Sequence, residues 1–345
     1  MTDRREFIAA AGAAALAAAA VTARAQPGAS VIKPPRIKAG DTLGLIHPAN
    51  ATFQKMELEI AIDNLKALGF KVKAGVHALD RYGYFAGKDA DRAADINAFF
   101  ADPEVQGICA VRGGWGAART LPYLDFPTIA KNPKVLFGFS DITALHLAIP
   151  AKTGLVTFHA PTGLSQWTEL SASWFKRVVI EGEAAQYVND ADLKGRIAQV
   201  TNRTQTVRPG KASGRLLGGN LSVLANLVGT PYLPDFSGKI LFLEDVNEGI
   251  YRVDRMLTQL KLAGLLSKIK GFIWGQCSDC EPDGSGYGSL TIEEVLDDHI
   301  KPLGIPAYRG AMIGHIDKQF TVPEGILAEM DADAGTFRLL ESAVV

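Results

Sequence analysis

The stretch KVLFGFSDITAL spans residues 134–145 and joins an apolar run to the start of a helical pattern. Residues 135–137 are good strand formers, and residues 142–148 are typical of a helix. Ser140 lies at the joint, where it would project from the carboxyl end of a strand with a positive helix N-terminus behind it. The next backbone N–H would then be free to stabilise an oxyanion. The alternative is that Ser140 merely caps the helix, since serine is a favoured N-cap residue and Ile142 replaces the second glycine of the usual nucleophile motif.

Strands and helices alternate on either side of this stretch. The patterns predict strands at residues 42–46, 70–74, 105–111 and 155–158, and helices at residues 54–68 and 90–100. Regular alternation of this kind predicts a parallel sheet with helices on both faces. Ligands bind beyond the carboxyl ends of the strands in such sheets. We therefore expect Ser140, Gly113, Gly114 and His47, which all follow strands, to lie along one edge.

The motif RGGWG at residues 112–116 follows one of these strands. It does not fit the G-x-G-x-x-G pattern of a dinucleotide loop, and no acidic residue follows at a suitable strand end. Glycines allow the backbone to approach a reacting carbonyl closely, and Arg112 offers a cation for a terminal carboxylate. The alternative is an ordinary glycine turn with a solvated arginine.

The second half contains a further set of strands and helices. Strands are expected near residues 214–219, 239–243 and 271–275, helices at residues 221–228, 251–266 and 291–299, and short antiparallel strands at residues 326–340. The length therefore suggests two domains, at residues 35–165 and 206–345. Residues 166–205 are polar and read as a connecting segment, part of it a loop over the site. Trp167 and Trp174 would line that loop or pack on it.

A nucleophilic serine needs a base, and the base needs an orienting carboxylate. Of the six histidines, His47 and His159 follow strands of the first sheet and are rivals for this role, as is His315 near the end of a strand in the second half. Glu244 ends an apolar strand and would be costly to bury without a partner, which a histidine would supply. The order Ser140, Glu244, His315 also occurs in one class of hydrolase.

The other three histidines fit the site less well. His146 should face packing because it lies six residues into the helix that begins at Ser140, well away from the direction of the serine. His299 should be solvated on the polar side of a capped helix, and His77 lies in a loop with no special setting.

The N-terminus has the pattern of an export signal. Paired arginines at residues 4–5 precede a phenylalanine, an isoleucine and an alanine-rich run that ends in an A-x-A site. This indicates a twin-arginine signal peptide at residues 1–25, cleaved after Ala25, and a periplasmic protein. A plain secretory signal or an uncleaved anchor is the alternative. No later stretch is apolar enough to cross a membrane.

Composition and cysteines limit the partners. A net charge of −1 gives no basic surface for nucleic acid. Cys109 lies in an apolar run and should be a buried, inert thiol. Cys277 and Cys280 have C-x-x-C spacing, which in an oxidising compartment allows either a local disulfide or two free thiols. Zinc would need two more ligands, and no second pair exists. We expect neither a metal nor a cofactor.

Several motifs occur together in one order over residues 35–340. They are RGGWG at 112–116, GFSDIT at 138–143, GGNL at 218–221, LEDV at 243–246, Y-x-x-DR at 251–255 and GH at 314–315. This combination closely resembles the serine LD-carboxypeptidases of the muramoyl-tetrapeptide carboxypeptidase family, which includes the microcin-immunity hydrolases. The resemblance implies a triad of Ser140, His315 and Glu244. It also implies a flavodoxin-like N-terminal domain, a smaller β-rich α/β C-terminal domain, a homodimer and no metal.

The resemblance implies a reaction as well. Ser140 would attack the amide between the L-centre of a diaminoacid and a terminal D-alanine in a murein tetrapeptide. The N–H groups near Gly114 and Asp141 would hold the oxyanion, Arg112 would hold the terminal carboxylate, and Gly113 and Trp115 would line the site. Two departures, the HPAN loop at residues 47–50 and Trp115 where tyrosine is common, bear on substrate preference. The export signal departs from the cytoplasmic recycling role familiar in the family.

Two other functions remain open on the sequence. One is an amidase acting on a peptide-nucleotide or another acyl-amino-acid conjugate, in which Trp167 or Trp174 would stack on a base. The other is a periplasmic binding protein, because two α/β domains around a cleft also describe that architecture. Binding alone would not require Ser140, Glu244 and His315 to converge.

Overall fold

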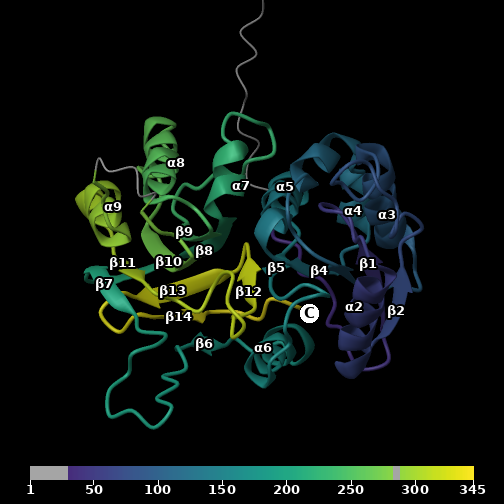
Figure 1. Cartoon of the computed structure of the whole chain (residues 1–345), viewed down its shortest axis with the longest axis horizontal. Coiled ribbons are helices and arrows are strands. Elements are labelled where there is room, and N and C mark those ends of the chain that lie inside the picture. The colour runs from purple at the N-terminus through teal and green to yellow at the C-terminus, as the bar shows by residue number, and fades with distance from the viewer. Residues whose placement is uncertain (1–29, 283–287) are drawn as a thin grey trace, which may run out of the picture.

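A computed structural model describes residues 30–282 and 288–345. Two sheets lie beside each other, each covered by helices (Figure 1). The predicted signal peptide at residues 1–25 falls outside the described residues. Within the described part of the chain, no helix combines the length and apolar character needed to cross a membrane.

The first sheet has six strands in the order β12-β5-β4-β3-β1-β2. Five of them come from the first half and run parallel: β1 (Thr42–Ile46), β2 (Lys71–Ala74), β3 (Gly107–Ala110), β4 (Val135–Gly138) and β5 (Thr157–His159). The order 2-1-3-4-5 is that of flavodoxin-like sheets, in which ligands bind where the strand order reverses. The predicted fold class of the N-terminal half is confirmed.

Helices cover both faces of this sheet because successive side chains along each strand point to opposite faces and are apolar on both. Leu43, Cys109 and Phe137 share one core with α2 (Lys55–Ala67). Their neighbours Ile108 and Leu136 share the other core with α3 (Asp89–Ala101), α4 (Phe126–Lys131) and α5 (Thr143–Thr153). Burial on both faces is what parallel strands require.

The second sheet has eight strands in the order β6-β14-β13-β8-β9-β10-β11-β7. Its centre is parallel, from β8 (Lys211–Asn220) through β9 (Ile240–Val246) and β10 (Gly271–Ser278) to β11 (Ala307–Arg309). The antiparallel flanks are β7 (Gln205–Arg208) on one side and β13 (Leu327–Asp331), β14 (Thr336–Leu339) and β6 (Gln186–Tyr187) on the other. Helices α7 (Leu221–Asn226), α8 (Ile250–Leu262) and α9 (Ile292–His299) pack on the parallel part. This is the expected β-rich α/β arrangement.

The two halves are joined by one strand of the second half that belongs to the first sheet. Strand β12 (Val322–Glu324) comes from the second half but pairs antiparallel with β5 in the first sheet. Directly after it, the N–H of Gly325 donates to the carbonyl of Leu216 on β8 at 2.7 Å. The chain therefore ties the sheets together, and both apolar cores continue from one half into the other.

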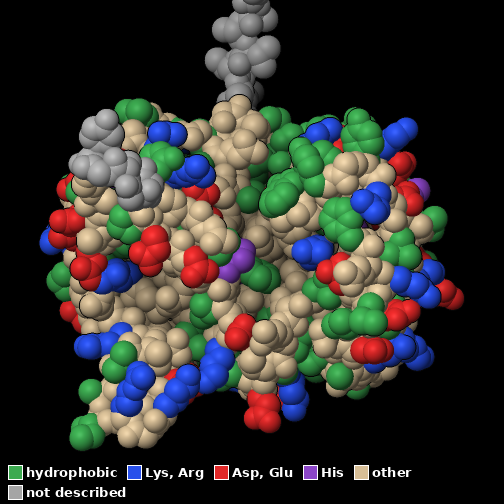
Figure 2. Space-filling view, in the orientation of Figure 1, with side chains coloured by type: hydrophobic (Ala, Val, Ile, Leu, Met, Phe, Trp, Pro, Cys, Tyr) green, Lys and Arg blue, Asp and Glu red, His purple; other side chains and the backbone are tan. Residues whose placement is uncertain are grey.

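The expected connecting segment is more ordered than its composition suggests. Helix α6 (Glu169–Phe175) and a π-helical turn (Lys176–Ile180) pack against the core, and Trp174 is only 5% exposed. The Trp174 ring stacks on Tyr187, and the indole N–H of Trp167 donates to the carbonyl of Thr162. Both tryptophans therefore pack and do not line a loop over the site. The loop between β6 and β7 projects outward from the molecule at the lower left of Figure 1 and Figure 2.

Candidate active site

Ser140 occupies a sharp turn between β4 and α5. Its φ is 66°, in the left-handed region that side chains other than glycine rarely adopt. A residue held there costs roughly 1–3 kcal/mol and persists only where the surroundings enforce it. Residues 140–142 form a short 3₁₀ turn that leads directly into α5. Phe139 is the N-cap position and no side chain caps the turn, so Ser140 does not act as the helix cap.

Three side chains from both halves meet at this turn. The Nε2 atom of His315 lies 3.0 Å from the Oγ of Ser140. On the other side of the ring, Nδ1 lies 2.8 Å from the Oε2 of Glu244. Both distances are normal hydrogen bonds. The structure therefore brings together the serine, histidine and carboxylate that the sequence singled out, in the expected sequence of contacts.

The three groups differ in exposure. The Glu244 side chain is fully buried, while that of His315 is 19% exposed and Ser140 is half-buried. Burial lowers the pKa of His315, but the hydrogen bond to Glu244 and the negative charges of Glu244 and Asp245 outweigh it, so the pKa is raised overall. A raised pKa makes the imidazole a better proton acceptor once it is neutral.

Gly113 and Gly114 bring the RGG turn against the serine. A Cβ on Gly113 would lie 2.8 Å from the Cβ of Ser140 and 3.3 Å from the backbone nitrogen of Asp141. Gly114 has φ 114°, and a Cβ there would lie 2.3 Å from the Cγ of Asn50. Only glycine fits at either position. The turn thus lies where an oxyanion between Ser140 and the Asp141 N–H would form.

The remaining predicted residues have different surroundings. The Asp141 carboxylate is buried and accepts the N–H of Ala117 at 2.6 Å, and burial raises its pKa to about 6. Its side chain therefore supports the turn, and only its N–H is available to the site. Arg112 is partly exposed and lies 3.6 Å from Glu57. Trp115 is 56% exposed beside Tyr84.

Neither rival histidine makes a hydrogen bond to Ser140 among the described residues. His47 is buried and its Nε2 pairs with the Oγ1 of Thr52; burial, together with the positive charge of Arg112, lowers its pKa to about 4. His159 is completely buried, and neither ring nitrogen has a hydrogen-bond partner among the described residues. His146, on α5, is buried as expected, and its Nε2 donates to the carbonyl of Gly138 at 2.9 Å. His299 was predicted to be solvated, and this prediction is wrong, because His299 is buried and pairs with Asp254.

Sequence reasoning missed two supports of the site. The Oγ1 of Thr143, at the start of α5, accepts the N–H of Asn220 at the end of β8, which fixes one half to the other beside Ser140. Arg92, on α3, is almost fully buried and donates to the carbonyls of Pro48, in the loop after β1, and Gly116, the last glycine of the motif at 112–116. An arginine on a helix normally reads as solvated, so nothing in the local sequence marks this role.

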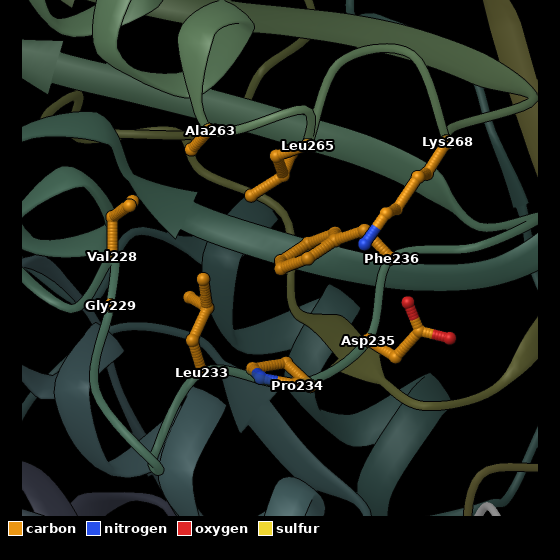
Figure 3. Close-up of a pocket in the computed structure, with 9 residues that line it drawn as sticks. All are labelled: Val228, Gly229, Leu233, Pro234, Asp235, Phe236, Ala263, Leu265 and Lys268. Atoms are coloured by element: carbon orange, nitrogen blue, oxygen red, sulfur yellow. The ribbon is translucent and has the colours of Figure 1, made fainter. Parts of the chain in front are cut away.

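Two other features lie apart from the triad. Within residues 30–282 and 288–345, His77, Asp80 and Asp91 place three ligand atoms within 4.8 Å of one another, a grouping that sequence spacing did not indicate. A pocket of about 270 Å³ lies between the loop after α7 and the end of α8. It is lined by apolar side chains such as Leu233, Phe236 and Leu265, with Lys268 at its rim (Figure 3).

A serine, a histidine and a buried carboxylate in hydrogen-bond contact form the arrangement that serine hydrolases share on unrelated folds. Two family models match the chain: the LD-carboxypeptidase N-terminal domain over residues 43–160 and the LD-carboxypeptidase C-terminal domain over residues 213–330. The chain therefore belongs to the LD-carboxypeptidase family.

Individual relatives agree with this assignment. The chain is 40% identical over 304 residues to a probable murein peptide carboxypeptidase of Bacillus subtilis, covering 87% of this chain and 91% of that one. It is similar to the structure of a muramoyltetrapeptide carboxypeptidase from Oxalobacter formigenes, with a TM-score of 0.73, 30% identity and coverage of 86% and 97%. It is also similar to the microcin C7 self-immunity protein MccF in complex with aspartyl sulfamoyl adenosine, with a TM-score of 0.81, 25% identity and coverage of 91% and 100%.

Proposed function

We propose that this protein is a serine LD-carboxypeptidase that releases the terminal D-alanine from the L-centre of a diaminoacid in murein tetrapeptides. One observation carries the proposal. His315 bridges Ser140 and the buried Glu244 through its two ring nitrogens, at 3.0 Å and 2.8 Å. A histidine that only stabilised the fold would not need a strained, half-buried serine on one side and a buried carboxylate on the other.

The proposed reaction follows from these contacts. His315 Nε2 takes the proton from the hydroxyl of Ser140, whose Oγ attacks the amide carbonyl. The negative charge of Glu244 stabilises the imidazolium and fixes the tautomer that presents a free Nε2 to the serine. The N–H groups of Asp141 and the glycine turn stabilise the oxyanion. D-Alanine leaves with the proton from His315, and water activated by the same histidine releases the acyl group.

The carboxypeptidase direction is supported by charge near the turn. Arg112 immediately precedes the close approach of Gly113 to Ser140, and its side chain is about one third exposed. Its ion pair with Glu57 is long at 3.6 Å, so the guanidinium is available to a substrate carboxylate. We propose that Arg112 binds the carboxylate of the terminal D-alanine, with Trp115 beside it.

The direct test is turnover of a defined muropeptide. Purified protein is incubated with a disaccharide tetrapeptide that ends in D-alanine, and released D-alanine is measured. Ser140→Ala is the matched control and should lose about 10⁴-fold in kcat while remaining folded, because triad members act as a unit. Retention of even a tenth of the activity in Ser140→Ala would show that the serine mechanism is wrong.

The same assay separates the alternatives. An acyl-amino-acid nucleotide conjugate tests the immunity-type amidase. That alternative would be favoured by a tryptophan free to stack on a base. Trp174 is buried, and the half-buried Trp167 packs on Phe175, which weighs against the amidase. Binding of the tetrapeptide without turnover would favour the binding-protein alternative, against which the peptidase family membership speaks. We further propose that the protein acts in the periplasm as a homodimer, testable by N-terminal sequencing of the exported protein and by light scattering.

A further inference from the structure

The C-x-x-C motif forms a disulfide beside the triad. Cys277 and Cys280 are bonded to each other at the end of β10. In the ladder between β10 and β9, Cys277 pairs with Asp245, the residue that follows Glu244. The disulfide therefore lies on the strand next to the one that carries the orienting carboxylate.

Ser278, the last residue of β10, contacts the segment that carries His315. Ser278, which directly follows Cys277, donates its hydroxyl to the backbone carbonyl of His315 at 2.9 Å. The carbonyl of Ser278 accepts the N–H of Asn247 at 2.9 Å, in the loop after Glu244. Ser278 thus joins the segment that holds the carboxylate to the segment that holds the histidine.

The segment that carries His315 is also held from other sides, since Met312 donates to Asn189 and the carbonyl of Asp317 accepts the hydroxyl of Ser171. It lies between β11 and β12, outside any regular strand. Closer to His315, the N–H of Gln276 donates to the carbonyl of Ile313 at 2.9 Å, so the end of β10 is one of the elements against which this segment is aligned. A shift of the β10 end would move the His315 backbone with it.

The disulfide closes the turn at residues 277–280, which begins where Ser278 pairs with Val246 at the end of the β10–β9 ladder. Asp279 has φ 55°, in the left-handed region, and the N–H of Cys280 reaches the carbonyl of Cys277 at only 3.4 Å. The covalent bond between Cys277 and Cys280 spans this turn and adds to its hydrogen bonds. Both sulfur-bearing residues are half-buried and hence accessible, whereas Cys109 is fully buried. Exposed disulfides are the ones that exchange with thiols most readily.

We infer that the Cys277–Cys280 disulfide and Ser278 form a redox-sensitive clamp on His315, so that reduction of the disulfide lowers turnover. The inference rests on the proposed role of His315. A dithiol reductant supplies two electrons and two protons, the S–S bond becomes two thiols, and the reductant becomes a disulfide. Ser278 is a positioning residue, because it contacts the backbone of His315 and not the substrate.

The first experiment compares the oxidised protein with protein treated with dithiothreitol, using tetrapeptide turnover. We expect kcat to fall about tenfold at unchanged KM, because small displacements of a catalytic group cost rate and leave binding intact. Reoxidation should restore kcat. The matched control, Cys277→Ser with Cys280→Ser, should show the lower kcat without reductant and no response to it.

A second pair of variants tests Ser278 with the disulfide intact. Ser278→Ala should lower kcat to the same extent, and Ser278→Thr, which keeps the hydroxyl, should restore it. Thermal unfolding of each variant verifies the fold. Unchanged kcat in both Ser278→Ala and the reduced protein would overturn the clamp, as would an equal response to dithiothreitol in the double serine variant.

A readout without substrate keeps this inference separate from the proposed function. The imidazole of His315 is titrated by NMR in oxidised and reduced protein, with assignment from His315→Gln. We expect a lower pKa after reduction, since a displaced ring loses its contact with Glu244. If neither form cleaves the tetrapeptide but the two titrations differ, the proposed function fails and the clamp stands. Identical titrations would overturn the clamp.

Discussion

Replacing Glu244 by glutamine removes one charge and leaves the volume of the side chain almost unchanged. Its Oε2 accepts Nδ1 of His315 at 2.8 Å, and its Oε1 has no hydrogen-bond partner among the described residues. No other described contact therefore holds the new amide in one orientation. In the orientation that donates to Nδ1, the ring carries its proton on Nε2 and cannot accept one from Ser140.

The magnitude follows from the charge. When His315 takes the proton, its charge lies about 4 Å from that of the carboxylate, an attraction of roughly 4 kcal/mol at an effective dielectric constant of about 20. At about 1.4 kcal/mol per factor of ten, Glu244→Gln should lose on the order of 10³-fold in kcat/KM. The loss should appear in kcat and leave KM nearly unchanged, because Glu244 does not contact the substrate.

The assay is D-alanine release as a function of pH, with two comparison variants. Glu244→Asp keeps the charge and should retain more activity than Glu244→Gln. Asp245→Asn removes a neighbouring buried carboxylate that contacts Asn220 and Ser222 but makes no hydrogen bond to His315, and should cost far less. Activity in Glu244→Gln above a tenth of wild type, or an equal loss in Asp245→Asn, would refute the assignment of Glu244.

Four further outcomes follow from the site. Gly113→Ala should fold but lose at least about 10²-fold in kcat, because its Cβ would displace Ser140; circular dichroism and turnover measure the two effects. The raised pKa of His315 should put the acid limb of kcat/KM above pH 6.5, and a limb below that value would contradict the pairing with Glu244. The pKa of Asp141 is about 6 in the folded protein and 3.8 in the unfolded chain, so Asp141 contributes about 3 kcal/mol to the free energy of unfolding below pH 3.8, and this contribution is lost as the pH rises to 6. In urea titrations, the free energy of unfolding of Asp141→Asn should therefore fall less over that pH range than that of the wild type. EDTA should leave turnover unchanged, and loss restored by zinc would refute the metal-free mechanism.

Local sequence was sufficient for the five parallel strands of the first sheet and for the turn at Ser140, but it did not predict β12. The strands of that sheet are short apolar runs, and each is followed by glycines or a helical pattern that marks its end. Ser140 was recognisable because one apolar run and one helix meet there within a few residues. The pairing of Glu244 with a histidine was also accessible, since a carboxylate at the end of a buried strand needs a partner.

Features that depend on distant contacts were not accessible in the same way. Residues 166–205 as a whole seemed a polar connection, yet Trp174 is buried against Tyr187 and Phe320, and Phe175 is buried against Phe70 and Phe137. His299 lies on a helix face that seemed solvated, but Asp254 on α8 meets it. In each case a partner far along the chain decides the burial, and periodicity within one helix carries no information about that partner.

The position of His315 is explained by the path of the chain between the sheets. Strand β11 belongs to the second sheet and β12 to the first, so the segment that carries His315 must cross from one to the other. Because β12 pairs with β5, next to β4, the crossing passes the end of the strand that precedes Ser140. Glu244, on β9 of the second sheet, meets the same segment from the other side, and a Cβ on Gly314 would lie 2.8 Å from its Oε2. His315 therefore reaches Ser140, 175 residues away along the chain, because the returning strand completes the first sheet. Pairing of β12 with β5 therefore also fixes the path of the segment that brings His315 to Ser140.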